Sequence, residues 1–150
     1  MIHAATRTDV DTAPLPRAAT AAVTRLTLTD FRGYARLRVD AAAAPVVLTG
    51  PNGAGKTNLL EALSFLAPGK GLRRAKLAEP DRRIDGVDAG RWAVAATVEN
   101  RTGTHSVGTG RDADAATERR SVRIDGAIAS QKDLSALLSI VWVAPEMDRL

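Results

Sequence analysis

The chain has 150 residues, about the length of one domain, with 21 Lys and Arg against 17 Asp and Glu and a formal net charge of +4. The absence of cysteine excludes disulfides and thiolate metal sites, and two scattered histidines, His3 and His105, form no metal cluster. No run approaches the roughly 18 apolar residues of a membrane helix. We therefore expect a cytoplasmic protein without a membrane partner, and the positive charge permits a nucleic-acid partner.

The N-terminal part predicts a tail followed by strands. Residues 1–22 are rich in Ala, Thr, Pro and Asp without periodicity, which predicts a disordered tail. Residues 23–28 and 34–39 alternate apolar and polar side chains, as half-buried strands do, and a short turn between them predicts a hairpin. A third strand begins at Pro45. Its continuously apolar sequence predicts burial on both faces.

A glycine-rich turn follows this third strand and opens onto an apolar-periodic segment. Gly50, Gly55, Lys56 and Thr57 fit the phosphate-binding pattern G-x-x-x-x-G-K-[ST]. Such glycines let backbone N–H groups point into one anion-sized hollow, and the following helix adds its positive end. An ordinary glycine turn would not need Lys56, which we expect to act catalytically on the β- and γ-phosphates, while Thr57 ligates Mg²⁺. The sequence therefore predicts a nucleoside triphosphate and Mg²⁺ as cofactors.

The next segments predict a helix and then a basic loop. The helix is expected over residues 56–66 and ends before Pro68-Gly69, with leucines of one helical stripe in the core. These leucines are Leu59, Leu60, Leu63 and Leu66. Residues 69–83 form the most basic stretch, and their Gly and Pro content predicts an irregular loop. Four of its cations are candidate DNA contacts: Lys70, Arg73, Arg74 and Lys76.

The remaining chain predicts mainly strands. The clearest covers residues 92–98, with Trp92, Val94, Ala96 and Val98 on one face. Weaker patterns predict a strand around residues 104–108 and another over 119–124, which turns at Asp125-Gly126. A helix capped by Ser130 is expected over residues 132–138, and a last strand over 140–143. Antiparallel β structure thus precedes and follows one helix that begins at the phosphate-binding loop.

A Phe31-Arg32 element on the predicted first hairpin precedes a loop that ends in Lys56-Thr57-Asn58. Together with residues 60–63, 69–73 and 141–147, these segments resemble the head domain shared by SMC proteins and ABC-type ATPases, and within that group the RecF family. The resemblance covers roughly residues 23–150 and implies an α/β P-loop NTPase of the ABC/SMC head type. We expect lobe I of such a head, truncated, with an antiparallel β layer packed against the P-loop helix.

The resemblance also implies roles for individual residues. Arg32 would lie near the phosphates or sugar, and Glu146 would occupy a catalytic position that senses Mg²⁺ and the attacking water. The family's Walker B acids, catalytic glutamate and signature motif are expected beyond Leu150, so we expect little hydrolysis by this chain. The residues expected to cradle ATP are Gly50, Pro51, Asn52, Gly53, Ala54, Gly55, Lys56, Thr57 and Asn58.

At the level of function, the resemblance implies ATP-dependent DNA binding in recombinational gap repair and the SOS response. ATP would drive a head-to-head homodimer that binds duplex DNA near single-strand junctions, with slow hydrolysis. The expected protein partners are RecR and RecO, which help to load RecA.

Two other functions remain open from the sequence. The chain could belong to the ATPase subunit of a transporter, which should carry an aromatic residue near the first strands and a glutamine in place of Glu146. It could also belong to an SMC-like phage-defence ATPase, which would continue into a long helical insertion. A third possibility is a nucleotide-binding fragment with no independent activity.

Overall fold

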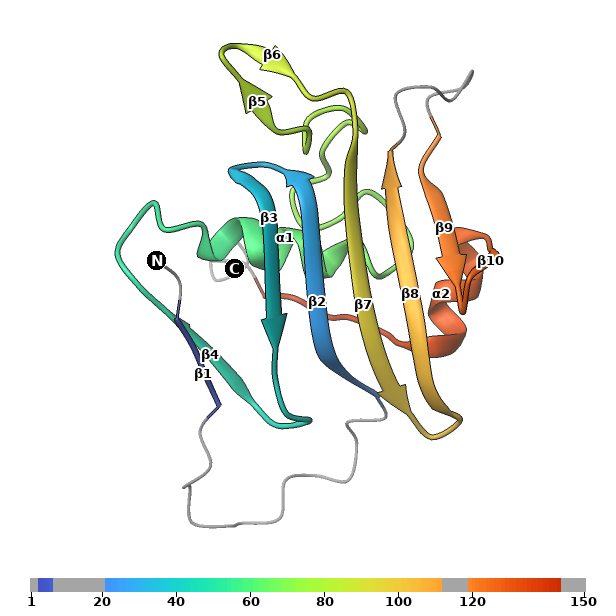
Figure 1. Ribbon diagram of the computed structural model, residues 1–150. Helices are drawn as coiled ribbons and strands as arrows, with labels where there is room; N and C mark the ends of the chain where they lie inside the picture. The colour runs from blue at the N-terminus through green and yellow to red at the C-terminus, as the bar shows by residue number, and fades with distance from the viewer. Residues whose placement is uncertain (1–2, 7–20, 112–118, 144–150) are drawn as a thin grey trace, which may run out of the picture.

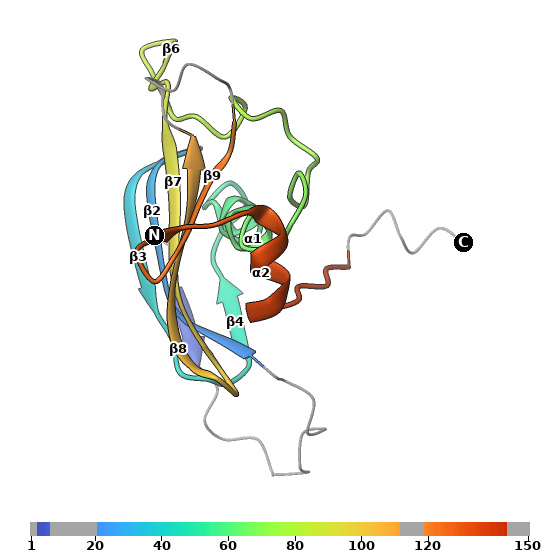
Figure 2. The same cartoon turned by 90° about the vertical axis from the view of Figure 1, so that its right-hand side faces the viewer.

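The computed structural model describes residues 3–6, 21–111 and 119–143, and its main element is a six-stranded antiparallel sheet (Figure 1). The strand order is β10-β9-β8-β7-β2-β3. Both helices, α1 (Lys56–Ser64) and α2 (Gln131–Leu137), lie on the same side of this sheet (Figure 2). The strands of the sheet are β2 (Ala21–Phe31), β3 (Tyr34–Asp40), β7 (Trp92–Asn100), β8 (Gly103–Arg111), β9 (Ser121–Ile124) and β10 (Ala127–Ile128).

The two predicted hairpins are confirmed. β2 pairs with β3 in an antiparallel register that places Leu28 opposite Leu37. β9 pairs with β10 across Asp125-Gly126, where both residues have positive φ as this tight turn requires. The short hairpin of β5 (Arg83–Ile84) with β6 (Val87–Asp88) was not predicted, because two-residue strands give no alternation to recognise.

Two predictions about the N-terminal half are wrong. The predicted disordered tail is contradicted at residues 3–6, where β1 (His3–Thr6) pairs with β4 (Val46–Thr49), and at residues 21–22, where β2 begins, while residues 7–20 lie outside the described residues. β4 is not buried on both faces, since Val46 and Val47 are exposed. In the described part of the chain β4 pairs with β1 alone, outside the large sheet, so its apolar side chains are not covered as those of a central strand would be.

The core lies between the large sheet and α1. Alternation along β7 puts Trp92, Val94, Ala96 and Val98 on the buried face, as predicted. α1 buries Leu59 and Ala62 against this face. The predicted leucine stripe is partly wrong, because Leu60 is 49% exposed and the helix ends at Ser64, before the buried Leu66.

Three aromatic rings form the centre of this core. Phe31 and Trp92 meet edge to face with ring centroids 5.7 Å apart, and Phe65 lies 4.9 Å from Trp92. Such pairs add about 0.5–1.5 kcal/mol each beyond the area they bury. The cluster therefore joins β2, β7 and the end of α1 into one unit.

The C-terminal segment agrees with the predictions in its helix but not in its strand. α2 begins after Ser130, as expected. Residues 140–143 form no strand, and Val141 and Val143 are among the exposed large apolar side chains. Across the described residues, no helix is both long and apolar enough to cross a membrane.

Ser130 and Asp133 form a reciprocal capping box at the start of α2. The Ser130 hydroxyl accepts from the Asp133 N–H at 3.3 Å, and the Asp133 carboxylate accepts from the Ser130 N–H at 2.7 Å. We expect Ser130→Ala to lower the free energy of unfolding by about 1 kcal/mol, measured by urea denaturation at pH 7. Ser135→Ala, which removes an exposed hydroxyl inside the same helix, is the matched control and should change stability less.

The effect of Ser130→Ala should depend on pH. Hydrogen bonds from Ser130 hold the pKa of Asp133 below its ordinary value. This carboxylate therefore stabilises the fold above its unfolded pKa of about 3.9, and the contribution is lost as the pH falls through the lower folded pKa. The difference in stability between wild type and variant should shrink as the pH falls through the folded pKa of Asp133, because only the bond between the Ser130 hydroxyl and the Asp133 N–H does not depend on the charge of the carboxylate. An unchanged difference at acid pH would contradict the contribution of the Asp133 carboxylate to the capping box.

Candidate nucleotide-binding site

The loop between β4 and α1 has the backbone that a phosphate site requires. Gly50, Gly53 and Gly55 have φ values of 146, 82 and 95°. A Cβ on Gly53 would meet no atom within 4 Å, so glycine is required there by conformation rather than by space. The predicted glycine turn is thus present with positive φ at three glycines, and its binding of phosphate stays a prediction.

The start of α1 is open to an anion. Gly55 is the N-cap and supplies no side-chain hydrogen bond, so no side chain of the cap accepts from the first N–H groups of the helix. These groups and the helix dipole together favour a bound phosphate. Backbone and helix therefore fit the phosphates of a nucleotide.

Lys56 lies across the mouth of this loop. Its Nζ donates to the carbonyl oxygens of Gly50 at 2.7 Å and Pro51 at 2.8 Å. An ammonium group has three donors, so the side chain can keep contact with the loop while it binds a phosphate oxygen. Thr57 is exposed at the first turn of α1, and no three His, Cys, Asp or Glu side chains gather as a metal site in the described residues.

The Tyr34 hydroxyl, which was not assigned from the sequence, donates to the Ala54 carbonyl at 3.4 Å and connects the first hairpin to the loop. Of the residues that were assigned, one lies near the loop and one outside the described residues. Asn58 follows on α1, with its side-chain oxygen 3.4 Å from Arg73 Nη1. Glu146 lies outside the described residues, and its catalytic role stays a prediction.

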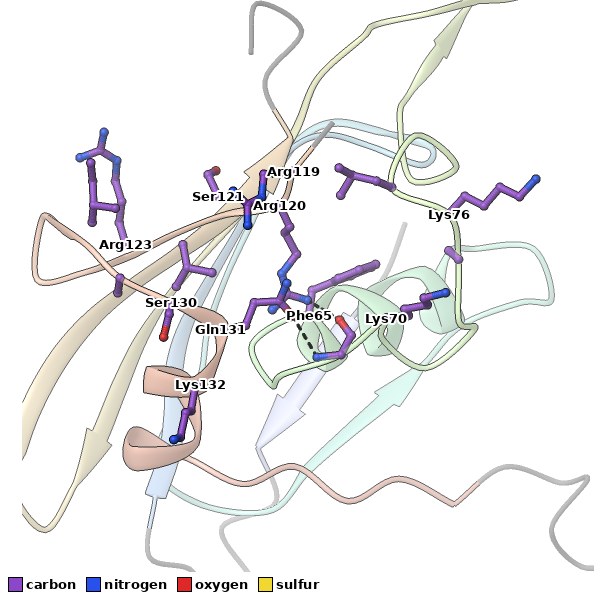
Figure 3. Close-up of a pocket in the computed structure, with 16 residues that line it drawn as sticks. Phe65, Lys70, Lys76, Arg119, Arg120, Ser121, Arg123, Ser130, Gln131 and Lys132 are labelled. Carbon is purple, nitrogen blue, oxygen red and sulfur yellow. Dashed lines mark hydrogen bonds between the residues drawn. The ribbon is translucent and has the colours of Figure 1, made fainter. Parts of the chain in front are cut away.

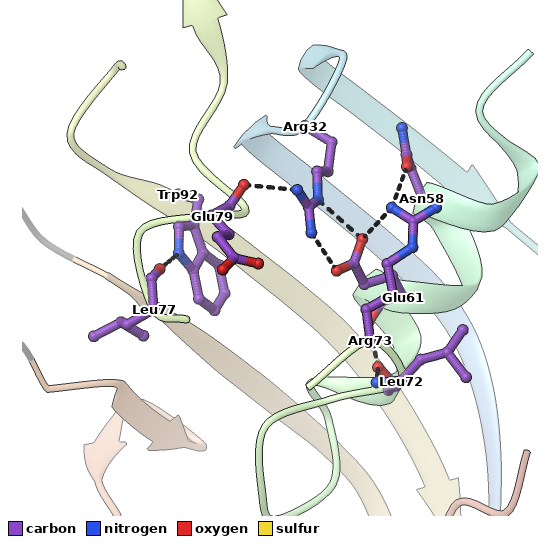
Figure 4. A network of polar contacts seen from close by, with 9 residues as sticks. Arg32, Asn58, Glu61, Leu72, Arg73, Leu77, Glu79 and Trp92 are labelled. Carbon is purple, nitrogen blue, oxygen red and sulfur yellow. Dashed lines mark hydrogen bonds and ion pairs between the residues drawn. The ribbon is translucent and has the colours of Figure 1, made fainter. Parts of the chain in front are cut away.

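A buried carboxylate beside the loop was missed by the sequence analysis. Glu61 of α1 is fully buried, and Arg32 contacts it through two hydrogen bonds, Nη2 to Oε1 at 2.6 Å and Nε to Oε2 at 3.0 Å (Figure 4). Arg73 Nη1 reaches Oε2 of the same carboxylate at 3.2 Å. An acidic residue inside an apolar helical repeat was the available signal, since a buried carboxylate needs cationic partners.

This network bears on two assignments made from sequence. The third guanidinium nitrogen of Arg32, Nη1, donates to the Glu79 carbonyl at 2.8 Å, so all three nitrogens bind protein acceptors. The contact of Arg32 with the nucleotide stays a prediction. Arg73, a candidate DNA contact, is bound to Glu61 instead of projecting freely. Lys70, Arg74 and Lys76 are exposed on the same loop.

The segment after α1 is irregular, as predicted, but it is firmly packed. Gly71 is buried with φ 73°, and a Cβ there would lie 2.9 Å from Ser64 Oγ and 3.2 Å from the Phe65 ring. The same Ser64 hydroxyl accepts from the Leu72 N–H at 2.6 Å. Glycine is needed at this close approach, and the loop is thereby held against the end of α1.

Comparison with known proteins gives matches over most of the chain. The family described as RecF/RecN/SMC N terminal domain matches residues 22–147. A Caulobacter vibrioides protein named DNA replication and repair protein RecF is 47% identical over 134 residues, which cover 88% of this chain and 34% of the relative. A Mesorhizobium japonicum protein of the same name is 47% identical over 129 residues, or 85% of this chain and 33% of the relative.

A solved structure supports the fold. It is described as the structure of the recombination mediator protein RecF-ATP in the RecFOR pathway, with TM-score 0.69, 18% identity, and coverage of 85% of this chain and 34% of that chain. The chain spans about a third of the length of the curated relatives it matches. The predicted ABC/SMC head fold, partial and with an antiparallel layer against the P-loop helix, is confirmed. The chain belongs to the RecF/RecN/SMC N terminal domain family.

Proposed function

We propose that this chain is the nucleotide-binding part of an ATP-dependent DNA-binding protein that acts in RecF-like repair. The observation that carries the proposal is the glycine loop at the start of α1, with Lys56 across its mouth. The repair role is favoured over a transporter or phage-defence ATPase because curated relatives at 43–47% identity carry the name DNA replication and repair protein RecF.

In this proposal, the loop and the start of α1 bind the triphosphate, and the side chains of Lys56 and Thr57 act on it. Lys56 would hold the β- and γ-phosphates of the nucleotide, and its positive charge would stabilise negative charge that develops there. The Thr57 hydroxyl would hold Mg²⁺, which would neutralise part of the triphosphate charge. Two heads brought together by ATP would form the homodimer, and DNA, RecR and RecO are proposed as partners of the whole protein.

We expect Lys56→Ala to weaken ATP binding about 10- to 100-fold in a calorimetric titration with Mg²⁺. A hydrogen bond to a charged group contributes about 1.5–3 kcal/mol, and each 1.4 kcal/mol is about tenfold in affinity. Lys70→Ala is the matched control, because it removes an exposed lysine outside the phosphate loop. Equal affinities of wild type and the Lys56 variant would contradict the assignment of this loop.

Chelation should separate the role of Thr57 from that of Lys56. Removing Mg²⁺ with EDTA should weaken ATP binding by the wild type, because the metal neutralises part of the triphosphate charge. Thr57→Val should bind less tightly in Mg²⁺ and lose little more in EDTA, since its metal ligand is already gone. A variant as sensitive to EDTA as the wild type would exclude Thr57 as a metal ligand.

The DNA binding of the whole protein is measured on a gapped duplex with and without ATP, at low and moderate salt. ATP-dependent binding that is lost in the Lys56→Ala variant would support the proposed link between nucleotide and DNA. Bound ATP without DNA binding under any condition would exclude the repair role and favour a transporter or defence ATPase.

A further inference from the structure

A basic groove lies beside α1. It is open, with a volume of about 1110 Å³, and lies between the segment after α1, strands β9 and β10, and the start of α2 (Figure 3). Among the described residues, no acidic side chain lines it. Six cations do, and we call this surface the basic groove: Lys70, Lys76, Arg119, Arg120, Arg123 and Lys132.

The cations of the basic groove lack carboxylate partners in the described part of the chain. Elsewhere, arginines do form ion pairs, as Arg25 does with Asp40 and Arg83 with Asp88. None of the six groove cations forms one within the described residues. Positive charges gathered on a concave surface without counter-ions focus the field and attract anions.

Arg120 forms the floor of the groove and is fixed there. Its Nη1 donates to the Gly69 carbonyl at 2.7 Å and its Nη2 to the Ala67 carbonyl at 3.0 Å, and its guanidinium lies 5.7 Å from the Phe65 ring centroid. Burial lowers the pKa of Arg120 to about 10, so it remains charged at neutral pH. Its Nε is buried without a partner in the described residues.

The lining favours contact with phosphates rather than with bases. Of the described residues that line the groove, Phe65 alone is aromatic, and it is buried beneath Arg120. Binding of single strands relies on aromatic faces on which bases stack, and this surface exposes none. A duplex presents its phosphates outward and needs only cations. One wall of the groove, formed by the segment after α1, supplies Lys70 and Lys76, and the other wall, formed by β9, the residues before it and the start of α2, supplies the remaining cations.

We propose that the basic groove binds the phosphate backbone of duplex DNA. This inference rests on the proposed DNA-binding function and names the surface that carries it. It retains Lys70 and Lys76 from the sequence assignment and adds four cations from β9, the residues just before it, and α2. It leaves out Arg73, which is bound to Glu61, and Arg74, which does not line the groove.

The test compares two double variants that remove the same charge. Arg119→Ala with Arg123→Ala removes two exposed groove arginines, whereas Arg36→Ala with Arg101→Ala removes two exposed arginines elsewhere. Arg36 lies on β3, at the opposite edge of the sheet from β10. Affinity for a labelled duplex is measured by fluorescence anisotropy over a salt series, with ATP and Mg²⁺ present.

We expect the groove variant to bind duplex DNA roughly tenfold or more weakly at about 0.15 M salt. Its slope of log affinity against log salt should be shallower by about 2, because each lost phosphate contact removes about one unit. The control should match the wild type. Lys70→Ala with Lys76→Ala, on the other wall, should reproduce the loss seen in the groove variant.

Several results would overturn the proposal. Equal losses in the groove and control variants would indicate general charge attraction and leave DNA binding itself in place. ATP binding by the wild type without DNA binding would remove both the proposed DNA function and the groove assignment. Single strands of the same length that bind as tightly, or polyglutamate that competes equally per charge, would exclude duplex DNA as the specific occupant.

Discussion

Replacing Trp92 by alanine is expected to lower the free energy of unfolding by about 3–5 kcal/mol. Its side chain is 2% exposed and contacts both other rings of the aromatic cluster, Phe31 and Phe65. The truncation would leave a large cavity that close-packed neighbours fill only in part. It would also remove the indole N–H that donates to the Leu77 carbonyl at 2.8 Å.

Urea denaturation followed by far-UV circular dichroism measures this effect. Trp92→Phe keeps a ring in the core but loses the hydrogen bond to Leu77, and it should cost less than the alanine variant. Val143→Ala is the control, because an exposed side chain away from the core should change stability by about 0.5 kcal/mol or less. A Trp92→Ala variant as stable as this control would disprove the central role of the cluster.

The second large effect is expected for Glu61→Ala. This carboxylate is fully buried and compensates two arginines that come from distant parts of the chain. Breaking a buried ion pair by removing one partner costs about 3–5 kcal/mol. The Arg32 and Arg73 side chains are 22% and 44% exposed, so water solvates part of their charge when the carboxylate is removed. We therefore expect the free energy of unfolding to fall by about 3 kcal/mol.

The matched control is Asp40→Ala. Asp40 also binds two arginines, Arg25 and Arg38, but all three side chains are about half exposed. Surface pairs contribute about 0–1 kcal/mol, so the control should be destabilised far less. Similar losses in both variants, measured by urea denaturation, would show that burial does not strengthen the Glu61 network.

The Glu61 variant also tests how the nucleotide site is held. Arg73 connects the segment after α1 to both Glu61 and Asn58, close to the phosphate loop. Loss of the carboxylate should therefore loosen this connection and weaken ATP binding, whereas Asp40→Ala should leave it unchanged. Unchanged ATP affinity in the Glu61 variant would show that the loop is held by its own backbone.

The sequence alone determined the features that depend on neighbouring residues. The pattern from Gly50 to Thr57 specifies a left-handed glycine loop, and alternation along residues 92–98 specifies one buried face. Asp125-Gly126 specifies a tight hairpin, and Ser130 specifies a helix start. In each case the conformation follows from φ preferences, side-chain period or a hydrogen bond within a few residues, so local sequence suffices.

Only the tertiary structure decided what depends on contacts between distant segments. Leu60 belongs to a helical leucine pattern but is 49% exposed, and β4 is apolar but pairs only with β1 in the described residues. Glu61 becomes a buried anion because Arg32, 29 residues away, packs against it. The basic groove forms because the segment after α1 folds beside β9, and no local pattern encodes which distant charges will meet across a sheet.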